Sequence, residues 1–276
     1  MKTKIVLITV LILFIVGCQD NPVIPEEEQL VLQAYLNAAE PVTDISVMLS
    51  KPLTSADTLN TPISTASVLL YKNNTSYVLT PSTQEPGKYY YAGGDLSVQP
   101  TEQYKIEVQY NGITSTAETI VPVKPENLSL NISTMTFTTE TMTEPFGSGT
   151  MQRITTSDSM VISWTNPTGE AFYVVVESVD PNRTVLQSDT MARLMDRRFV
   201  TEPMREDHYR VFDRDLNYTG KHKITVYRVN QEYVNLYKSR QQDSRSLNEP
   251  ITNVKNGLGI FTAFASDSLF FNVILQ

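Results

Sequence analysis

The chain of 276 residues contains a single cysteine, Cys18. No disulfide within one chain can therefore form, and the fold must rest on a hydrophobic core. Basic residues are also scarce, since 22 Lys and Arg stand against 30 Asp and Glu, which gives a net charge of −8 at pH 7. An acidic chain is poorly suited to nucleic acid or to an anionic lipid surface, so neither is expected as a ligand.

Histidine is nearly as rare, with only His208 and His222. Their separation does not match the short spacings of metal-binding histidine pairs, so we predict no metal site. Glu206 and Asp207 stand directly before His208, but adjacent carboxylates are common in any acidic protein. Only a convergent polar pocket around these three residues would favour catalysis.

The chain also lacks the glycine motifs of common active sites. Gly147-Ser148-Gly149 does not match the G-x-S-x-G turn of serine hydrolases. Gly257 and Gly259 precede a strand pattern, whereas a phosphate-binding loop precedes a helix, so a bulge or tight turn is the expected role. We predict no catalytic residue, no cofactor and no enzymatic activity.

The N-terminal apolar run is too short to span a membrane. Ile5–Gly17 is broken only by Thr9 and follows Lys2 and Lys4. A spanning helix needs about 20 apolar residues, whereas a short run behind basic residues is typical of a secretory signal peptide. Residues 1–17 are therefore predicted to be a signal peptide.

The end of this segment, Ile15-Val16-Gly17-Cys18, resembles the bacterial lipobox. The resemblance implies that Cys18 receives diacylglycerol and fatty acyl chains such as palmitate, which anchor the protein in a lipid bilayer. Residues 18–29, with two prolines and three consecutive glutamates, are predicted to be an acidic, extended tether. The acids after Cys18 resemble the surface-export signal of Bacteroidota lipoproteins, although only Asp20 is close to the cysteine. The resemblance implies an outer-membrane lipoprotein; the cell-surface face is favoured, and the periplasmic face stays open.

The rest of the chain shows the period-two alternation of β-strands, bounded by turn residues. Prolines in Val121–Pro125 indicate a linker, so we predict an N-terminal β-sandwich at 30–122 and a C-terminal one at 123–276. Together they predict an all-β protein of two tandem immunoglobulin/fibronectin III-like sandwiches. The expected N-terminal strands are Leu30–Asn37, Asp44–Ser50, Ala66–Tyr71, Ser76–Thr80, Lys88–Ala92, Gln103–Tyr110 and Thr114–Val121.

In the second domain, the run VISWTNPTGEAFYVVVESVDP resembles the B and C strands of a fibronectin type III-like module, with Trp164 in the core. Thr139–Thr156 is predicted to be a long hairpin or a mobile loop. Tyr233, Leu236 and Tyr237 share one face at helical spacing, which predicts a short helix at Gln231–Gln241. Two final strands are expected, at Ile260–Ala265 and Leu269–Leu275.

The C-terminal third carries a family resemblance. It contains QEYVNLY at 231–237, NEP at 248–250 and NVKNGLGIF at 253–261, while VLQAYL at 31–36 fits the same pattern. These segments are similar to a Bacteroidota outer-membrane lipoprotein family known as domain of unknown function 4249. Its members often occur beside TonB-dependent receptors, which implies a transport-associated role and such a receptor as a partner. The resemblance implies no catalytic residue.

Two weaker patterns concern surfaces. Tyr89, Tyr90 and Tyr91 are consecutive, so alternation sends them to opposite faces of one strand; edge packing is favoured over ligand recognition. Four D-[ST]-apolar matches resemble Bacteroidota O-glycosylation sites, although some are ordinary strand starts. Their acceptor residues are Thr58, Ser159, Thr190 and Ser268.

The sequence therefore favours a non-enzymatic lipoprotein that assists a TonB-dependent transporter in ligand capture or uptake. The alternative is an independent surface adhesin or a glycan- or matrix-binding module, because the end loops of tethered sandwiches suit that task. The sequence does not identify the ligand.

Overall fold

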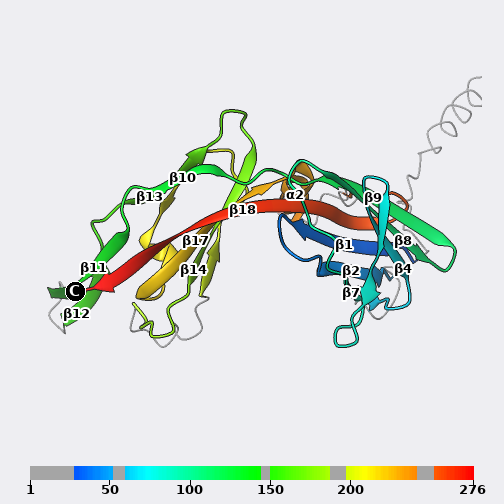
Figure 1. Ribbon diagram of the computed structural model, residues 1–276. Coiled ribbons are helices and arrows are strands. Elements are labelled where there is room, and N and C mark those ends of the chain that lie inside the picture. The colour runs from blue at the N-terminus through cyan, green and yellow to red at the C-terminus, as the bar shows by residue number, and fades with distance from the viewer. Residues whose placement is uncertain (1–27, 52–59, 144–149, 187–196, 241–251) are drawn as a thin grey trace, which may run out of the picture.

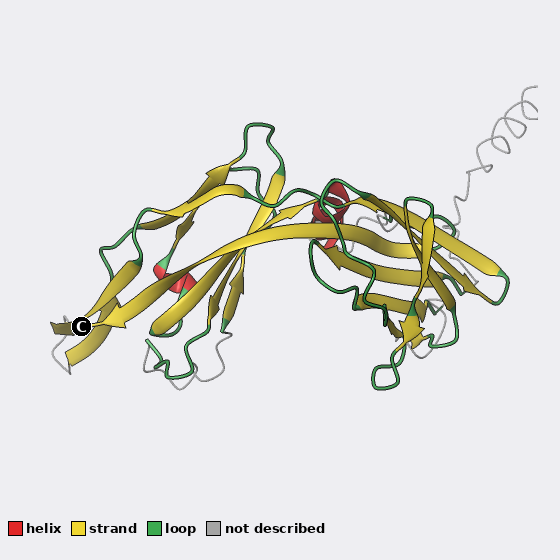
Figure 2. Ribbon diagram, viewed as in Figure 1, coloured by secondary structure: helices red, strands yellow, loops and turns green. Residues whose placement is uncertain are grey.

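The computed structural model describes residues 28–51, 60–143, 150–186, 197–240 and 252–276. These residues form an elongated molecule of two β-lobes, through which one long strand, β18 (Leu258–Leu275), runs (Figure 1). Helical structure among them is confined to α2 (Gln231–Arg240) and the short 3-10 helix η2 (Asp213–Asp215) (Figure 2). The predicted class, all-β sandwiches with one short helix, is confirmed.

The N-terminal lobe is a sandwich of two sheets. One sheet has the order β1-β2-β7-β6, with β3 on β2 and the first half of β18 beside β1, and the other has the order β5-β4-β8-β9. The strands are β1 (Leu30–Asn37), β2 (Asp44–Leu49), β3 (Thr61–Pro62), β4 (Ser67–Lys72), β5 (Thr75–Val78), β6 (Thr80–Pro81), β7 (Lys88–Tyr90), β8 (Gln103–Tyr110) and β9 (Ile113–Ile120).

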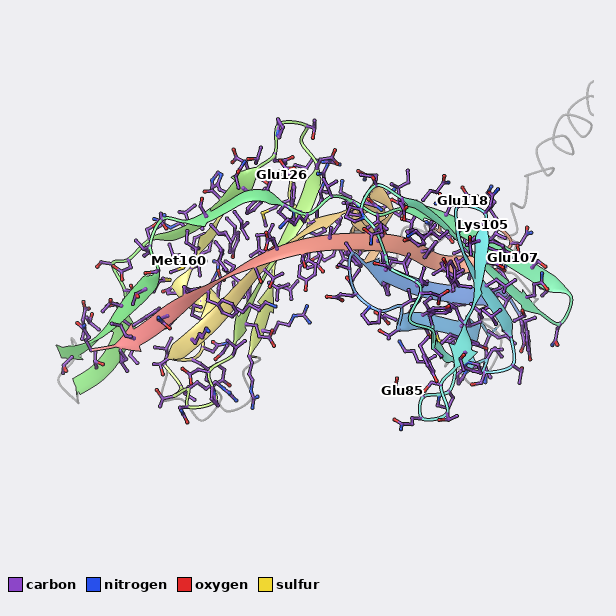
Figure 3. The ribbon with its side chains drawn as sticks, viewed as in Figure 1. Glu85, Lys105, Glu107, Glu118, Glu126 and Met160 are labelled. Carbon is purple, nitrogen blue, oxygen red and sulfur yellow. The ribbon has the colours of Figure 1, made fainter. Side chains whose placement is uncertain are left out.

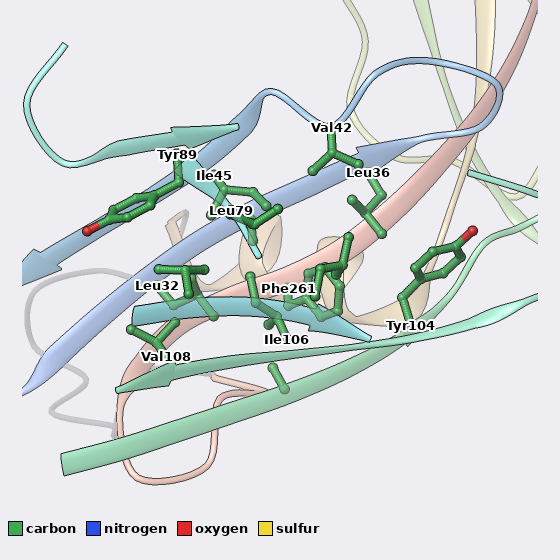
Figure 4. Close-up of a cluster of buried hydrophobic side chains, with 14 of the residues drawn as sticks. Leu32, Leu36, Val42, Ile45, Leu79, Tyr89, Tyr104, Ile106, Val108 and Phe261 are labelled. Carbon is green, nitrogen blue, oxygen red and sulfur yellow. The ribbon is translucent and has the colours of Figure 1, made fainter. Parts of the chain in front are cut away.

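Strict alternation along these strands builds the core of this lobe. On β8, Tyr104, Ile106 and Val108 are buried, whereas Lys105 and Glu107 lie on the outer face (Figure 3). The inward side chains meet those of the facing sheet and of β18 (Figure 4). Burial of each large apolar side chain contributes about 1.5–3 kcal/mol, and no disulfide within the chain adds to it, since the sequence has one cysteine.

The C-terminal lobe is a second sandwich. A sheet of order β10-β13-β16 faces a sheet of order β15-β14-β17-β18. Trp164 is buried at the centre, 5.4 Å from the Phe172 ring, so its predicted core position is confirmed. The strands are β10 (Glu126–Leu130), β11 (Thr134–Thr143), β12 (Thr150–Thr155), β13 (Met160–Thr165), β14 (Ala171–Ser178), β15 (Arg198–Val200), β16 (His208–Val211) and β17 (Gly220–Val229).

The prediction of two separate final strands was wrong, because residues 258–275 form one continuous strand. Ser266-Asp267-Ser268 suggests a turn by composition, but these residues pair with Tyr227, Val226 and Thr225 of β17. A partner strand of matching length satisfies the backbone groups and overrides the weak local preference for a turn.

β18 also connects the two lobes. Its first residues pair in parallel with β1, from Val31–Leu258 to Asn37–Phe264. Phe261 and Ala263 belong to the core of the N-terminal lobe, while Phe271 and Val273 belong to the core of the C-terminal lobe. The division at residue 122 stays a prediction; the structure adds that the N-terminal sheet recruits residues from beyond it.

Helix α2 covers the junction of the lobes. It begins at Gln231, as predicted, and Val234 on its inner face is buried. Five rings gather under and beside the helix, and we call them the joint cluster: Tyr35, Tyr173, Tyr227, Tyr233 and Phe264. Asn230 ties the start of α2 to the N-terminal lobe, since its Nδ2 donates to Thr119 Oγ1 at 2.9 Å and to the Ile120 carbonyl at 2.8 Å.

The threonine-rich segment forms the predicted long hairpin. Six residue pairs join β11 and β12, from Thr138–Thr155 to Thr143–Thr150. The start of β11 pairs in parallel with the end of β18, from Thr134–Asn272 to Phe137–Leu275. The hairpin therefore lies at the end of the molecule where β18 finishes (Figure 1).

Candidate functional site

The structure brings together two of the three residues that were candidates for catalysis and leaves Glu206 apart from them. His208 Nδ1 lies 2.8 Å from Asp207 Oδ1, and this hydrogen bond lowers the pKa of Asp207. Both side chains are more than half exposed. Glu206 accepts a hydrogen bond from the Arg205 N–H and lines a hollow that the other two do not line. The convergent pocket that would favour an enzyme is not formed by these residues.

The hollow beside Glu206 lies between α2 and the segment that follows β15. It has a volume of about 440 Å³ and is lined by Ala171, Glu202, Pro203, Met204, Arg205, Glu206, Val234 and Lys238. The Arg205 guanidinium donates to the Gly169 carbonyl and to Gln231 Oε1, the latter at 2.6 Å. Arg205 thus connects a loop to the helix, which is a structural role.

The described part of the chain also contains no candidate metal site. No group of three or more His, Cys, Asp or Glu side chains there is arranged to hold a metal ion. Over the same residues, no helix has the length and apolarity needed to cross a membrane.

His222 is buried on β17, with 2% of its surface exposed, and its ring stacks on Phe271 at 5.2 Å. Nδ1 lies 3.0 Å from the Gly220 carbonyl oxygen, so this nitrogen carries the proton of the neutral ring. Burial lowers the pKa of His222, although the hydrogen bond to Gly220 and the nearby Asp180 carboxylate oppose the shift. His222 is therefore a core residue whose neutral form is favoured by burial.

The free energy of unfolding is expected to fall as the pH is lowered through about 6.5, the ordinary pKa of histidine. The unfolded chain binds a proton at His222 before the folded chain does, so acid favours unfolding until the lower pKa of the folded state is reached. Urea unfolding between pH 5 and 7.5 should show a weaker pH dependence in His222→Gln than in the unchanged chain. Equal slopes in the two proteins would contradict the expectation.

The predicted modification sites occupy different environments. Ser159 is exposed between β12 and β13, whereas Ser268 is half-buried in the middle of β18. Cys18, Thr58 and Thr190 lie outside the described residues, so the lipidation and glycosylation of these positions stay predictions. Ser159 is the most accessible acceptor of the two that the structure describes.

The three consecutive tyrosines follow the alternation. Tyr89 is buried, and its hydroxyl donates to the Ile63 carbonyl at 2.9 Å. Tyr90 is 38% exposed, and Tyr91 donates to Asp95 Oδ1 at 2.5 Å. Tyr89 and Tyr91 therefore stabilise their own lobe, which leaves Tyr90 as the exposed ring.

A more prominent surface lies on the outer face of the C-terminal lobe. The strand register places Arg198, Glu177, Lys223 and Phe270 in one row across β15, β14, β17 and β18. Phe270 is 51% exposed, and Lys221 Nζ lies 4.2 Å from the centre of its ring. Three of these five residues are basic, although the chain as a whole is acidic.

The sequence analysis did not identify this outer face, although the sequence contains the pattern that defines part of it. Lys221 and Lys223 alternate along β17, and Phe270 lies in β18. Their parity assigns them to one side of a sheet. Their neighbours across the sheet follow only from the order of strands β14, β17 and β18, which the sequence did not reveal.

Similar solved structures are distant. The FN1–FN3 domains of chicken CNTN1 match at 14% identity and a TM-score of 0.29, over 75% of this chain and 60% of that chain. Titin domains A168–A170 match at 12% identity and a TM-score of 0.21, over 89% of this chain and 66% of that one. The chain thus spans less than two thirds of either. No curated protein matches the chain.

Strand order and pairing define the class: an all-β protein of two immunoglobulin/fibronectin III-like sandwiches that share one strand. Within that class, the chain belongs to the family described as Domain of unknown function (DUF4249), whose sequence model matches residues 19–269. The family description assigns no activity, and a sandwich fold by itself does not define one.

Proposed function

We propose that the chain is a non-catalytic outer-membrane lipoprotein, anchored through acylated Cys18, that assists a TonB-dependent transporter in capturing or taking up its ligand. The observation that carries the proposal is the course of β18. Its first residue pairs beside Val31 near the start of the folded chain, and its last pairs beside Phe137 in the C-terminal lobe. Eighteen residues of strand extend over about 60 Å.

In the anchored protein, this geometry would place one lobe closer to the bilayer than the other. Cys18 precedes β1 by twelve residues, a tether that reaches at most about 40 Å from the bilayer. Since β18 and α2 join the lobes, the C-terminal lobe and its hairpin are held on the side remote from the start of β1 (Figure 1). Such an arrangement suits a module that presents a surface to a neighbouring protein.

The choice of a transporter as the neighbour is supported by the resemblance to a family whose members often occur beside TonB-dependent receptors. An adhesin would use the same architecture, and the partner that co-purifies distinguishes the two.

We expect a TonB-dependent receptor to co-purify in stoichiometric amount when the tagged, lipidated protein is extracted gently from outer membranes. Mass spectrometry of the purified material identifies the partner. A protein that is recovered alone would contradict the transporter role and favour glycans or matrix proteins as the next ligands to screen.

The substitution Cys18→Ser is expected to move the protein from the membrane fraction to the soluble fraction. Two or three acyl chains, each contributing about 0.8 kcal/mol per buried methylene, hold the unchanged protein in the bilayer, and serine provides no thiol for their attachment. Fractionation and intact-mass measurement check both points, with Ser50→Ala as the control for handling. A Cys18→Ser protein that stays in the membrane fraction would contradict lipid anchoring.

A further inference from the structure

One edge of β18 has no neighbouring strand in its middle section. On this side, β1 ends with the pair Asn37–Phe264, and β11 begins with the pair Thr134–Asn272. Residues 265–271 between these two pairs are bonded to β17 on the opposite side. In the described part of the chain, no strand is hydrogen-bonded to β18 on this side, although β10 of the facing sheet lies close to it. We call these seven residues the open edge of β18.

The strand alternation decides which backbone groups point toward this open edge. The Phe264 carbonyl accepts a hydrogen bond from the Ala38 N–H at 2.8 Å, and the Asn272 N–H donates to the Ser133 carbonyl at 3.0 Å. Even-numbered residues of β18 therefore direct their N–H and C=O groups to the side of β1 and β11. Ser266, Ser268 and Phe270 do so within the open edge.

Most of these groups are available for pairing. The Ser268 N–H is satisfied by Asp267 Oδ1 at 2.9 Å. The backbone groups of Ser266 and Phe270, and the Ser268 carbonyl, have no backbone partner among the described residues. Lys124 forms an ion pair with Asp267 beside the edge, but these side chains are 67% and 40% exposed, so the pair contributes at most about 1 kcal/mol.

The other edge of β18 shows how this fold covers exposed backbone. Beyond the end of β17, Asn253 Nδ2 donates to the Phe261 carbonyl at 2.7 Å, and the Phe261 N–H donates to Asn253 Oδ1 at 2.9 Å. The side-chain amide thereby takes the place of a strand. Native proteins cover free edges in such ways to prevent unwanted pairing. Among the described residues, we find no side-chain amide that bonds to the backbone of Ser266 or Phe270 in this way.

Charge and exposure at the open edge favour a particular type of strand. The Phe270 ring, 51% exposed, offers apolar area, and Lys221 Nζ lies 4.2 Å from its centre. Lys223 is the direct neighbour of Phe270 on β17. An added strand beside Phe270 would therefore meet ammonium groups on the outer face, where carboxylates complement them.

We propose that the open edge of β18, at residues 266–270, binds an extended acidic peptide segment of a partner protein as an added β-strand. Backbone hydrogen bonds to Ser266 and Phe270 provide the pairing, and carboxylates of the segment that face outward interact with Lys221 and Lys223. The seven-residue gap admits about seven ligand residues, or about 23 Å of strand, between Asn37 and Thr134. The inference goes beyond the proposed function, because it depends on neither the anchor nor the transporter.

The test starts with the purified full-length lipoprotein in detergent micelles and a phage library of random twelve-residue peptides. Enriched peptides are expected to alternate acidic with β-branched or aromatic residues. The best peptide is then synthesised, and its dissociation constant is measured for the unchanged protein and for variants.

Ser266→Pro should weaken binding at least tenfold, because it removes a donor from the open edge and places a ring there. The bonds to β17 come from odd-numbered residues and are kept. Ser266→Ala is the matched control and should bind within twofold of the unchanged protein. Lys221→Glu should weaken binding at least fivefold, whereas Lys238→Glu, the same change on α2, should have little effect.

Variants of the peptide test the proposal on the unchanged protein, so the result does not depend on whether Ser266→Pro folds. N-methylation of alternate amides yields two complementary peptides, of which only one loses the donors that face β18. One should lose binding and the other should keep it. Absence of enriched peptides, a consensus without acidic residues, or equal loss for both peptides would overturn the proposal.

A second copy of the chain is the other candidate for this edge. Sedimentation that shows a dimer, dissociated by Ser266→Pro, would likewise overturn the peptide proposal. The transporter is absent from these measurements, so their result is separate from that of the co-purification.

Discussion

Replacement of Gly259 by alanine is expected to lower the free energy of unfolding by about 3 kcal/mol or more. Gly259 has φ of +108°, a conformation that residues with a side chain rarely adopt. A Cβ there would overlap the Leu32 carbonyl oxygen and lie 2.8 Å from its carbonyl carbon. Since Leu32 pairs with Gly259, the added methyl group would push β1 away from β18.

Urea unfolding measures this effect, with Gly94→Ala as the matched control. A Cβ at Gly94 meets nothing within 4 Å, so that substitution should change stability by at most about 0.5 kcal/mol. Trp164, the only tryptophan, reports on the C-terminal lobe, and a shift of its transition by a substitution in the N-terminal lobe would show that the two unfold together. Equal stabilities of the two glycine variants would contradict the expectation.

Phe264→Ala is expected to cost about 3–5 kcal/mol, the range for a buried phenylalanine. Phe264 is 7% exposed at the centre of the joint cluster. Its ring stacks on Tyr35 at 5.9 Å and meets the edge of Tyr233 at 5.1 Å, so it contacts a side chain of β1 and one of α2. Its loss would leave a cavity where the two lobes and the helix meet.

The matched control is Phe270→Ala, the same change six residues further along the same strand. Phe270 is 51% exposed, and its removal should cost less than about 1 kcal/mol. Hydrogen exchange adds a local measurement, since the amides of α2 should lose protection in Phe264→Ala and keep it in Phe270→Ala. Equal losses in the two variants would show that the joint cluster does not hold the helix.

Local pattern predicted most of the strands, because their information lies in neighbouring residues. The alternation of Tyr104, Ile106 and Val108 and the turn residues around β8 define that strand without reference to its partners. The short strands β3 and β15 were missed, since two or three residues carry no periodic signal. Residues 266–268 were predicted to interrupt the strand because their local composition favours a turn. Their strand conformation depends on partners in β17 that lie some forty positions earlier in the sequence.

The candidate surface was less predictable than the fold. Its open edge depends on where β1 ends and β11 begins relative to β18, a register that involves residues more than a hundred positions apart. The family resemblance at 253–261 identified a distinctive segment beside this edge, but it did not explain why these residues are found there. The structure supplies that reason, since Asn253 covers the edge at Phe261 and Gly259 permits the close approach of Leu32.

The shared strand also sets the order in which the protein is completed. Val31 and Leu258, which pair in the N-terminal sheet, are 258 − 31 = 227 positions apart. The first lobe to leave the ribosome therefore lacks one of its strands until nearly the whole chain has been synthesised, and contacts of such long range form late. For the exported lipoprotein proposed above, this delay would be an advantage, because neither lobe is complete while residues are still being added.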